Sequence, residues 1–342
     1  MTDKPLRGVM IGAGYFSQFH ADAWRRLAPD VSIVGVCDQK EAAASVLAGE
    51  LGAQGFAPDD LEAVIADNAI DFVDIATPPP THRDLCRRVA ATGAAILCQK
   101  PLGTDYADAE AIVAEMADTR FMVHENWRWQ PWHRKAKALL DEGTLGDLHA
   151  ITFHARLGDG WQEDAYLARQ PYFRTYPRLF MYETGVHFLD LFRFLGGDIA
   201  SITAHLSKRN RDIAGEDAAL VLCRFASGAS AMLDASRYNE PEHEDARYTF
   251  GTMRIDGSKG HLRLEADGSL HLKLLGGPVR RLDFAPSRQG FAGDSVFATF
   301  QHFAGCLRSG APFETSGAQY LKTLALVEAA YRAEQTGQTI CV

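Results

Sequence analysis

The chain has 342 residues, of which 46% are hydrophobic and 23% charged, and its net charge is −9. These totals are typical of a globular protein of about two domains, and the negative charge argues against a nucleic-acid partner, because binding to phosphates needs a basic face. No apolar stretch reaches the roughly 20 residues of a membrane span, and the polar start Met1–Pro5 leads at once into an apolar run, so we expect neither a membrane partner nor a signal peptide.

Residues 6–124 alternate short apolar runs with amphipathic stretches. The runs predict strands near 7–12, 32–37, 71–76, 94–98 and 120–124, and the stretches between them predict helices near 15–28, 40–51, 59–67, 81–92 and 105–118. This alternation indicates an α/β fold with a doubly wound parallel sheet, in which ligands bind at the carboxyl ends of the strands.

The first predicted strand ends in a glycine turn that leads into a helix. The turn residues are Gly12, Ala13, Gly14, Tyr15 and Phe16. Gly12 permits the turn, and Gly14 lets the backbone approach a pyrophosphate at the helix N-terminus. The second strand ends in Asp38, whose carboxylate can accept hydrogen bonds from both ribose hydroxyls, so this pattern predicts NAD binding in preference to NADP. Ser17 replaces the third glycine of the usual fingerprint, and the alternative is an ordinary strand–helix turn.

Two later strand ends carry further polar residues. Thr77 and Pro78 follow the third strand, and His82 comes shortly after them, where it either contacts the ligand or simply begins a helix. Gln99 and Lys100 follow the fourth strand, at an edge where we expect both to contact the cofactor. A lysine at this edge can donate a hydrogen bond to a substrate hydroxyl and favour the developing alkoxide. The alternative is a solvated lysine with no role in binding.

The pattern changes after about residue 147, where several strands follow one another with turn signals between them. These strands are expected at 148–157, 202–206, 218–225, 229–235, 248–255, 261–264, 270–274 and 279–284, with helices at 184–195, 294–309 and 317–336. Their order predicts an α+β domain with a large, mostly antiparallel sheet. We therefore expect a nucleotide domain at 1–124 and a substrate and oligomerisation domain at 125–342, whose final helix could pack back on the first.

A polar stripe interrupts the apolar helix expected at 184–195. Glu183, His187 and Asp190 are spaced so that they share one helix face. Histidine is well suited to accept a proton near neutral pH, and a carboxylate can orient it. A buried structural histidine and a metal site are the alternatives, but no further ligands with metal spacing accompany Glu183 and His187, so we expect no metal.

Aromatic residues and an arginine follow the last strand of the first domain. Trp127 and Arg128 suit a sugar pocket, because a ring covers carbinol faces and a guanidinium donates to hydroxyls. The alternative is a packed interdomain hinge, which applies most to Trp129 and Trp132. Weaker pocket candidates are Arg156, Trp161, Tyr172 and Arg174.

Taken in order, these motifs resemble the glucose–fructose oxidoreductase, inositol dehydrogenase and rhizopine-catabolism (Gfo/Idh/MocA) family over essentially the whole chain. The resemblance implies that Lys100 and His187 form the catalytic pair, in which His187 takes the hydroxyl proton and Lys100 holds the oxygen. Three departures are Gln99 in place of the frequent glutamate, Glu183 in place of the commoner aspartate, and Ser17.

The family resemblance implies an NAD-dependent dehydrogenase of a sugar or polyol, similar to the branch that oxidises free aldoses such as D-apiose to the lactone. Two alternatives are an NAD-using epimerase or glycosidase without net redox change and a non-catalytic NAD-sensing regulator. The family and the apolar residues on both faces of the second sheet also imply a homo-oligomer, at least a dimer. Six scattered cysteines without a Cys-x-x-Cys motif suggest the cytoplasm.

Overall fold

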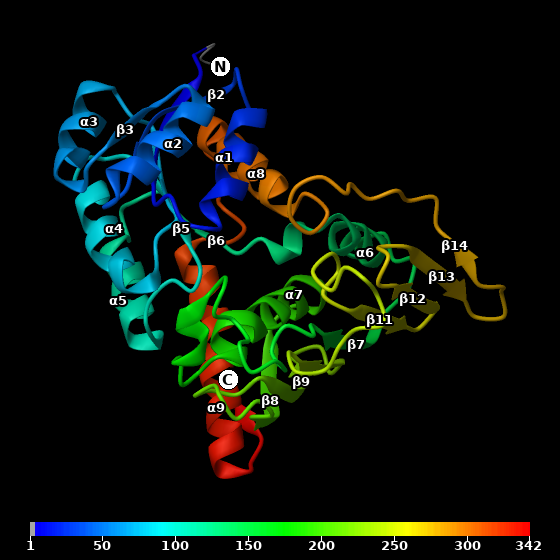
Figure 1. Ribbon diagram of the computed structural model, residues 1–342. Helices are drawn as coiled ribbons and strands as arrows, with labels where there is room; N and C mark the ends of the chain where they lie inside the picture. Colours follow the sequence, from blue (N-terminus) through cyan, green and yellow to red (C-terminus); the bar gives the residue numbers. More distant parts are fainter. Residues whose placement is uncertain (1–3) are drawn as a thin grey trace. The chain divides into compact units, whose positions relative to one another are not determined.

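The computed structural model describes residues 4–342, which divide into two compact units (Figure 1). The first unit contains the chain up to Asn126 together with Ser295–Lys322, and the second contains Trp127–Asp294 and Thr323–Val342. The boundary expected after residue 124 lies close to Asn126. The return of residues 295–316 to the first unit was not part of that expectation, whereas residues 317–322 begin the final helix, which was expected to be able to pack back on the first domain.

The first unit is built on a six-stranded sheet with the order β3-β2-β1-β4-β5-β6, in which every pair is parallel. Its strands are β1 (Leu6–Ile11), β2 (Val31–Cys37), β3 (Gln54–Phe56), β4 (Phe72–Ile75), β5 (Ala95–Gln99) and β6 (Phe121–His124). Its connecting helices are α1 (Ser17–Arg26), α2 (Glu41–Leu51), α3 (Leu61–Asp67), α4 (His82–Ala90) and α5 (Tyr106–Glu115). The predicted doubly wound fold is confirmed, and the short strand β3 is an addition to it.

Helix α8 (Ser295–Ser309) covers part of this sheet beside α1 (Figure 1). The indole of Trp24 stacks on the ring of Phe300 with centroids 4.1 Å apart. Arg120 donates hydrogen bonds to the carbonyl oxygens of Cys306, Gly310 and Ala311 at 2.7–3.0 Å. Aromatic stacking and these hydrogen bonds explain why this late segment belongs to the first unit.

The second unit is built on a nine-stranded sheet with the order β14-β13-β12-β11-β7-β10-β9-β8-β15. Its strands are β7 (Leu148–Arg156), β8 (Ile199–Ser207), β9 (Ala218–Phe225), β10 (Ser230–Ser236), β11 (Thr252–Gly257), β12 (Gly260–Leu264), β13 (Leu270–Leu274), β14 (Arg280–Arg281) and β15 (Ile340–Cys341). Only β7 and β10 pair in parallel, so the mostly antiparallel sheet is confirmed. The strand expected from residue 248 begins only at Thr252, because Phe250 and Gly251 have φ angles of 62° and 140° that a strand does not accept.

One face of this sheet is buried under helices and the other is exposed. Ring contacts join Phe153 of β7 to Phe188 of α7 (Val186–Gly196), and α6 (Pro131–Asp141) lies beside α7. The last helix is α9 (Gly317–Thr336). On the opposite face Leu220 and Leu222 are 45% and 50% exposed. Within residues 4–342, no helix combines the length and apolarity that crossing a membrane requires.

Candidate active site

The glycine turn of the first unit has the geometry of a dinucleotide cradle. Gly12 has a φ of 105°, and a Cβ atom there would lie 2.7 Å from the carbonyl oxygen of Ala76, so only glycine fits. Gly14 is exposed, and a Cβ atom there would meet nothing within 4 Å. The backbone after Gly12 therefore borders open space. Helix α1 begins there and has no acidic residue in its first turn that would repel an anion. These residues fit the pyrophosphate of NAD.

The carboxylate of Asp38 lies at the same edge of the sheet and fixes two backbone amides. Its oxygens accept hydrogen bonds from the N–H groups of Ala13 and Lys40, both at 2.8 Å. Each carboxylate oxygen keeps capacity to accept another bond, as recognition of ribose hydroxyls requires. Beside this turn, Tyr15 is exposed and Phe16 is half-buried, and the two rings flank Phe19 with centroids 6.0 and 5.2 Å from it.

His82 joins the two loops that follow β4 and β5. Its ring nitrogens lie 2.9 Å from the carbonyl oxygen of Leu102 and 2.8 Å from that of Thr77, and the side chain is fully buried. Burial lowers the pKa of this imidazole, while the carbonyl groups oppose the shift. The structure therefore gives His82 a bracing position under the loop that carries Pro78, and not a surface position open to a ligand.

Lys100 follows β5 and is half-buried, and its backbone N–H donates to Oε1 of Gln99 at 2.8 Å. The Nε2 atom of Gln99 lies 3.0 Å from Nε2 of His20. Gln99, predicted to bind the cofactor, thus directs both ends of its amide toward other groups of the protein. His20 and its partner Asp74 were not identified from the sequence, because they lie 54 positions apart on a helix and in the middle of a strand.

His187 lies in the first turn of α7, directly after a π-helical segment at Phe180–Gly185. The imidazole of His187 is 5% exposed and stacks on the indole of Trp127, with centroids 4.5 Å apart and planes within 2°. Trp127 also stacks on Phe250 at 4.1 Å. Trp127 therefore fixes the plane of His187 from one side. Single π-helical turns are frequent at functional sites, and Glu183 lies in this one.

A buried arginine that the sequence pattern did not indicate contacts the π-helical segment Phe180–Gly185. Arg237 follows β10 and donates to the hydroxyl of Thr184 at 2.8 Å and to both oxygens of Asp159 at 3.1 and 2.6 Å. Burial opposes its charge, but Asp159 together with Tyr166 and Glu183 outweighs this effect, so the pKa of Arg237 is raised. The guanidinium also lies 4.9 Å from the ring centroid of Phe173, so it connects the loop before α7 to the π-helical turn.

Asp190 and Arg128 form a buried ion pair. The guanidinium Nε and Nη2 atoms donate to the two carboxylate oxygens at 2.8 and 2.6 Å, and the arginine and aspartate side chains are only 9% and 2% exposed. Thr323 adds a bond of 3.2 Å to the same carboxylate. Asp190 was predicted as a catalytic residue and Arg128 as a substrate residue, but the structure directs each toward the other.

The remaining aromatic residues have different surroundings. Trp161 is 44% exposed, whereas Trp129 and Trp132 are buried in the second unit. Tyr172 is partly exposed, and burial together with the negative charge of Glu183 raises the pKa of its phenol. Arg156 pairs with Asp234 at 2.8 Å, on the exposed face of the sheet. Of this group, Tyr172 and Trp161 are therefore the side chains open to a ligand.

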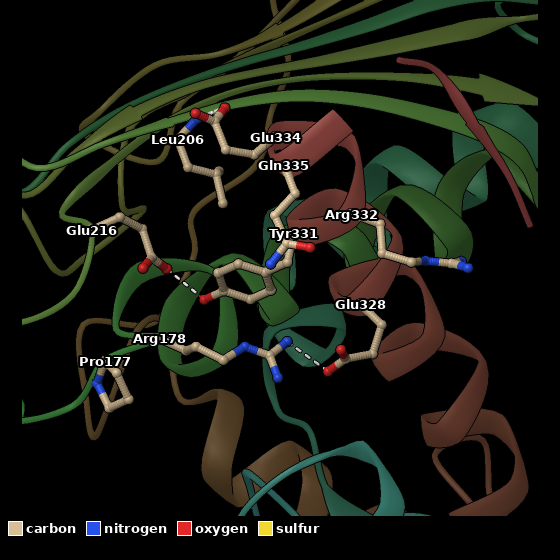
Figure 2. Close-up of a pocket in the computed structure, with 9 residues that line it drawn as sticks. All are labelled: Pro177, Arg178, Leu206, Glu216, Glu328, Tyr331, Arg332, Glu334 and Gln335. Carbon is tan, nitrogen blue, oxygen red and sulfur yellow. Dashed lines mark hydrogen bonds and ion pairs between the residues drawn. The ribbon is translucent and has the colours of Figure 1, made fainter. Parts of the chain in front are cut away.

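A separate pocket of about 400 Å³ lies beside α9 (Figure 2). The phenol of Tyr331 donates to Glu216 at 2.5 Å, and Arg178 donates to Glu328 at 2.6 Å. The lining contains none of the residues predicted from the sequence as ligand or catalytic groups. No group of three His, Cys, Asp or Glu side chains in residues 4–342 is placed to hold a metal ion.

Comparison with known proteins identifies the family. The family described as "Oxidoreductase family, NAD-binding Rossmann fold" matches residues 6–126, and the "GFO/IDH/MocA C-terminal domain" matches residues 133–263. The D-apiose dehydrogenase of Rhizobium rhizogenes is 36% identical over 99% of this chain and 98% of its own length, and that of Paraburkholderia graminis is 36% identical over 99% and 90%.

A solved structure supports the same conclusion. An oxidoreductase from Agrobacterium radiobacter in complex with NAD+, L-tartaric acid and magnesium has a TM-score of 0.88 and is 34% identical, with 98% of each chain covered. The inositol 2-dehydrogenase of Rhizobium meliloti is 29% identical over 96% of each chain. With both of its domains matched over most of their length, this chain belongs to the Gfo/Idh/MocA family of NAD-binding oxidoreductases.

Proposed function

We propose that this NAD-dependent oxidoreductase oxidises a carbinol of a sugar or polyol, with a free aldose such as D-apiose as the leading substrate. The observation that carries the proposal is the fixed imidazole of His187, held on Trp127 next to the π-helical turn that contains Glu183. The names of the two relatives at 36% identity support the aldose.

In the proposed reaction, bound NAD supplies the hydride acceptor at its nicotinamide ring. Gly12, Gly14 and Asp38 hold the dinucleotide at the carboxyl edge of the first sheet. His187 accepts the proton of the substrate hydroxyl, and the Lys100 ammonium donates a hydrogen bond to that oxygen as it gains charge. Glu183, one turn before His187, is the acidic residue of this part of the site. The products are a carbonyl compound, one proton and the reduced cofactor.

A panel of aldoses and polyols that includes D-apiose, followed by NADH absorbance, tests the substrate class. His187→Ala and Lys100→Ala should each lower kcat by about 10²–10⁴-fold, because each removes a group that acts on the reacting hydroxyl. His149→Ala and Lys137→Ala are matched controls at exposed or half-exposed positions and should leave kcat unchanged. Turnover near the wild-type rate in either active-site variant contradicts the role assigned to that residue.

The same assay separates the dehydrogenase from two other functions, neither of which releases NADH. An epimerase or glycosidase would consume a sugar derivative with NAD bound but release no NADH. A regulator would bind NAD and a sugar without turnover. Lys100 and His187 are both present, which favours the dehydrogenase over the regulator.

We further propose a cytoplasmic homodimer that buries the exposed face of the second sheet. Leu220 and Leu222 form with the half-buried Met232 an apolar strip across β9 and β10. The family resemblance also implies pairing through this sheet. The six cysteines are free thiols, which suits a reducing compartment. Light scattering tests the dimer: Leu222→Glu should lower the mass toward that of one chain, while Leu275→Glu, at an exposed position outside this strip, should not. A wild-type mass near 37.5 kDa contradicts the proposal.

A further inference from the structure

A series of buried polar side chains in the first unit is hydrogen-bonded to one another and to the backbone of Lys100. Nδ1 of His20 lies 2.9 Å from the carboxylate of Asp74, and Nε2 of the same ring lies 3.0 Å from Nε2 of Gln99. Oε1 of Gln99 accepts the backbone N–H of Lys100 at 2.8 Å. His20 and Asp74 are fully buried and Gln99 is 9% exposed. We refer to Asp74, His20 and Gln99 as the Asp74 relay.

The direction of every hydrogen bond in the relay follows from its ends. The backbone N–H of Lys100 can only donate, so the Gln99 amide must present its oxygen there and its NH₂ group to His20. Nε2 of His20 must therefore accept, which places the ring proton on Nδ1, where it donates to Asp74. The carboxylate also accepts from the indole N–H of Trp24 at 2.7 Å. With this tautomer each atom of the relay has the partner it needs.

The surroundings of His20 leave little freedom to change this arrangement. Its ring is enclosed by Phe16 at the start of its own helix, Phe300 of α8 and His124 of β6, at centroid distances of 5.6, 5.0 and 4.5 Å. Asp74 and His124 are the titratable side chains that these contacts place against it. A buried carboxylate is tolerated only when donors satisfy it, and here Nδ1–H of His20 and Nε1–H of Trp24 do so.

The geometry shows what a glutamate, as in the family's frequent Glu-Lys-Pro sequence, would meet at position 99. A glutamate at position 99 would direct a carboxylate oxygen at the lone pair of His20, which is repulsive unless one of the two groups gains a proton. It would also add a second buried negative charge near Asp74. The amide of Gln99 avoids both effects, because its NH₂ group donates to His20 at 3.0 Å.

We propose that Gln99 is a positioning residue that holds the main chain of Lys100, and that the Asp74 relay fixes the orientation of the Gln99 amide. The proposal rests on the proposed function in that Lys100 acts on the substrate. The relay reaches from the middle of β4 through α1 to the end of β5. It thereby ties the position of Lys100 to the packed interior of the first unit.

Two substitutions of His20 separate the two ends of the relay. His20→Asn places an amide N–H where Nδ1 donates to Asp74 but removes the acceptor for Gln99. His20→Gln places an amide oxygen where Nε2 accepts from Gln99 but removes the donor to Asp74. We expect His20→Asn to lower kcat by about 10–100-fold, because a shift of about 1 Å can cost 10²-fold. We expect His20→Gln to lower kcat less, with the NAD dissociation constant changed by less than about 3-fold in both variants.

Equal kcat values in the two variants, a slower His20→Gln enzyme, or an unchanged His20→Asn enzyme would each overturn the proposal. Gln99→Met, which keeps the side-chain length but removes the amide, serves if His20→Asn does not fold. It should lower kcat by a factor similar to that expected for His20→Asn, and wild-type turnover by Gln99→Met would also overturn the proposal.

A second measurement tests the assigned hydrogen-bond direction without substrate. In Gln99→Glu the folded state must hold an extra proton between positions 99 and 20, so its stability is present at low pH and is lost as the pH rises. The melting temperature of Gln99→Glu should therefore fall further below that of the wild type between about pH 5.5 and about pH 8.5.

In the His20→Gln background the new amide can turn its N–H toward the carboxylate introduced at position 99, so this pH-dependent gap should shrink. A gap of the same width in both backgrounds would refute the assigned direction. If the wild-type enzyme reduces no NAD with any sugar, the proposed function fails, but this stability test of the relay still stands.

Discussion

The ion pair between Arg128 and Asp190 predicts a large and specific loss of stability. Arg128→Met removes the cation but leaves a carboxylate that is 2% exposed, with only the hydroxyl of Thr323 as a remaining donor among the bonds described above. Breaking a buried pair by removing one partner typically costs about 3–5 kcal/mol. With a urea slope of about 3 kcal/mol per molar, the unfolding midpoint of the second unit should fall by about 1–1.7 M.

Tryptophan fluorescence suits this measurement, because four of the five tryptophans lie at positions 127–161 in the second unit. Asp190→Asn should lower the midpoint as well, since it leaves the guanidinium without its charged partner. The double variant Arg128→Met, Asp190→Leu removes both charges and fills the space with apolar groups. Its midpoint should return close to that of the wild type.

The double variant also decides whether the ion pair takes part in the chemistry. If the pair only anchors α7, kcat recovers together with the stability. If Arg128 or Asp190 acts on His187 or the substrate, the fold recovers and kcat stays low. An unchanged midpoint in Arg128→Met would refute the reasoning, because it would mean that the buried charge of Asp190 is compensated elsewhere.

Three further predictions concern single side chains. Trp127→Leu removes the stacking on His187 and should lower kcat by about 10-fold with little change in NAD affinity, whereas unchanged turnover would show that the ring plane needs no support. Asp38→Asn keeps an acceptor for the N–H of the glycine turn but removes the negative charge. The ratio of kcat/KM for NAD to kcat/KM for NADP should therefore fall, whereas the control Asp22→Asn in α1 should leave this ratio constant. Burial lowers the pKa of His133 to about 4, so at acid pH the unfolded chain binds a proton that the folded chain excludes. The free energy of unfolding should therefore fall by about 3 kcal/mol in all as the pH falls from about 6.5 to about 4. His133→Asn can still donate to the carbonyl oxygen of Trp127, and urea unfolding followed by tryptophan fluorescence should show a flatter acid profile; an unchanged slope would contradict this origin.

The strands that could be predicted from the sequence are those with a strong local pattern. In a continuous apolar run such as Phe72–Ile75, or an alternating run such as Ala218–Phe225, the order of the side chains indicates which of them are buried. Strands β3 and β15 have three and two residues and depend on pairing with a neighbour, so no period could identify them. Helix α6 was not expected, because its first turn follows a tryptophan-rich segment that was interpreted as a pocket.

Most of the candidate cofactor residues were proposed because a residue type and a strand end coincide. Gly12, Asp38 and Lys100 are of this kind, since each follows a run that the pattern identifies as a strand. The partners of site residues could not be predicted, because contacts such as that between Arg128 and Asp190 join positions 62 apart. The sequence shows that Arg128 can donate and Asp190 can accept, but not that they satisfy each other.

The return of residues 295–322 to the first unit has a consequence for the order in which the protein is made. A ribosome that has released residues 6–126 has delivered all six strands of the nucleotide sheet, but not the helix whose Phe300 lies against Trp24. The nascent sheet must wait, with this apolar surface uncovered, until about 200 further residues have emerged, which at 5–20 residues per second takes about 10–40 s. During that interval the emerging chain is a natural client for chaperones, and a fragment that stops at residue 126 should be insoluble on its own.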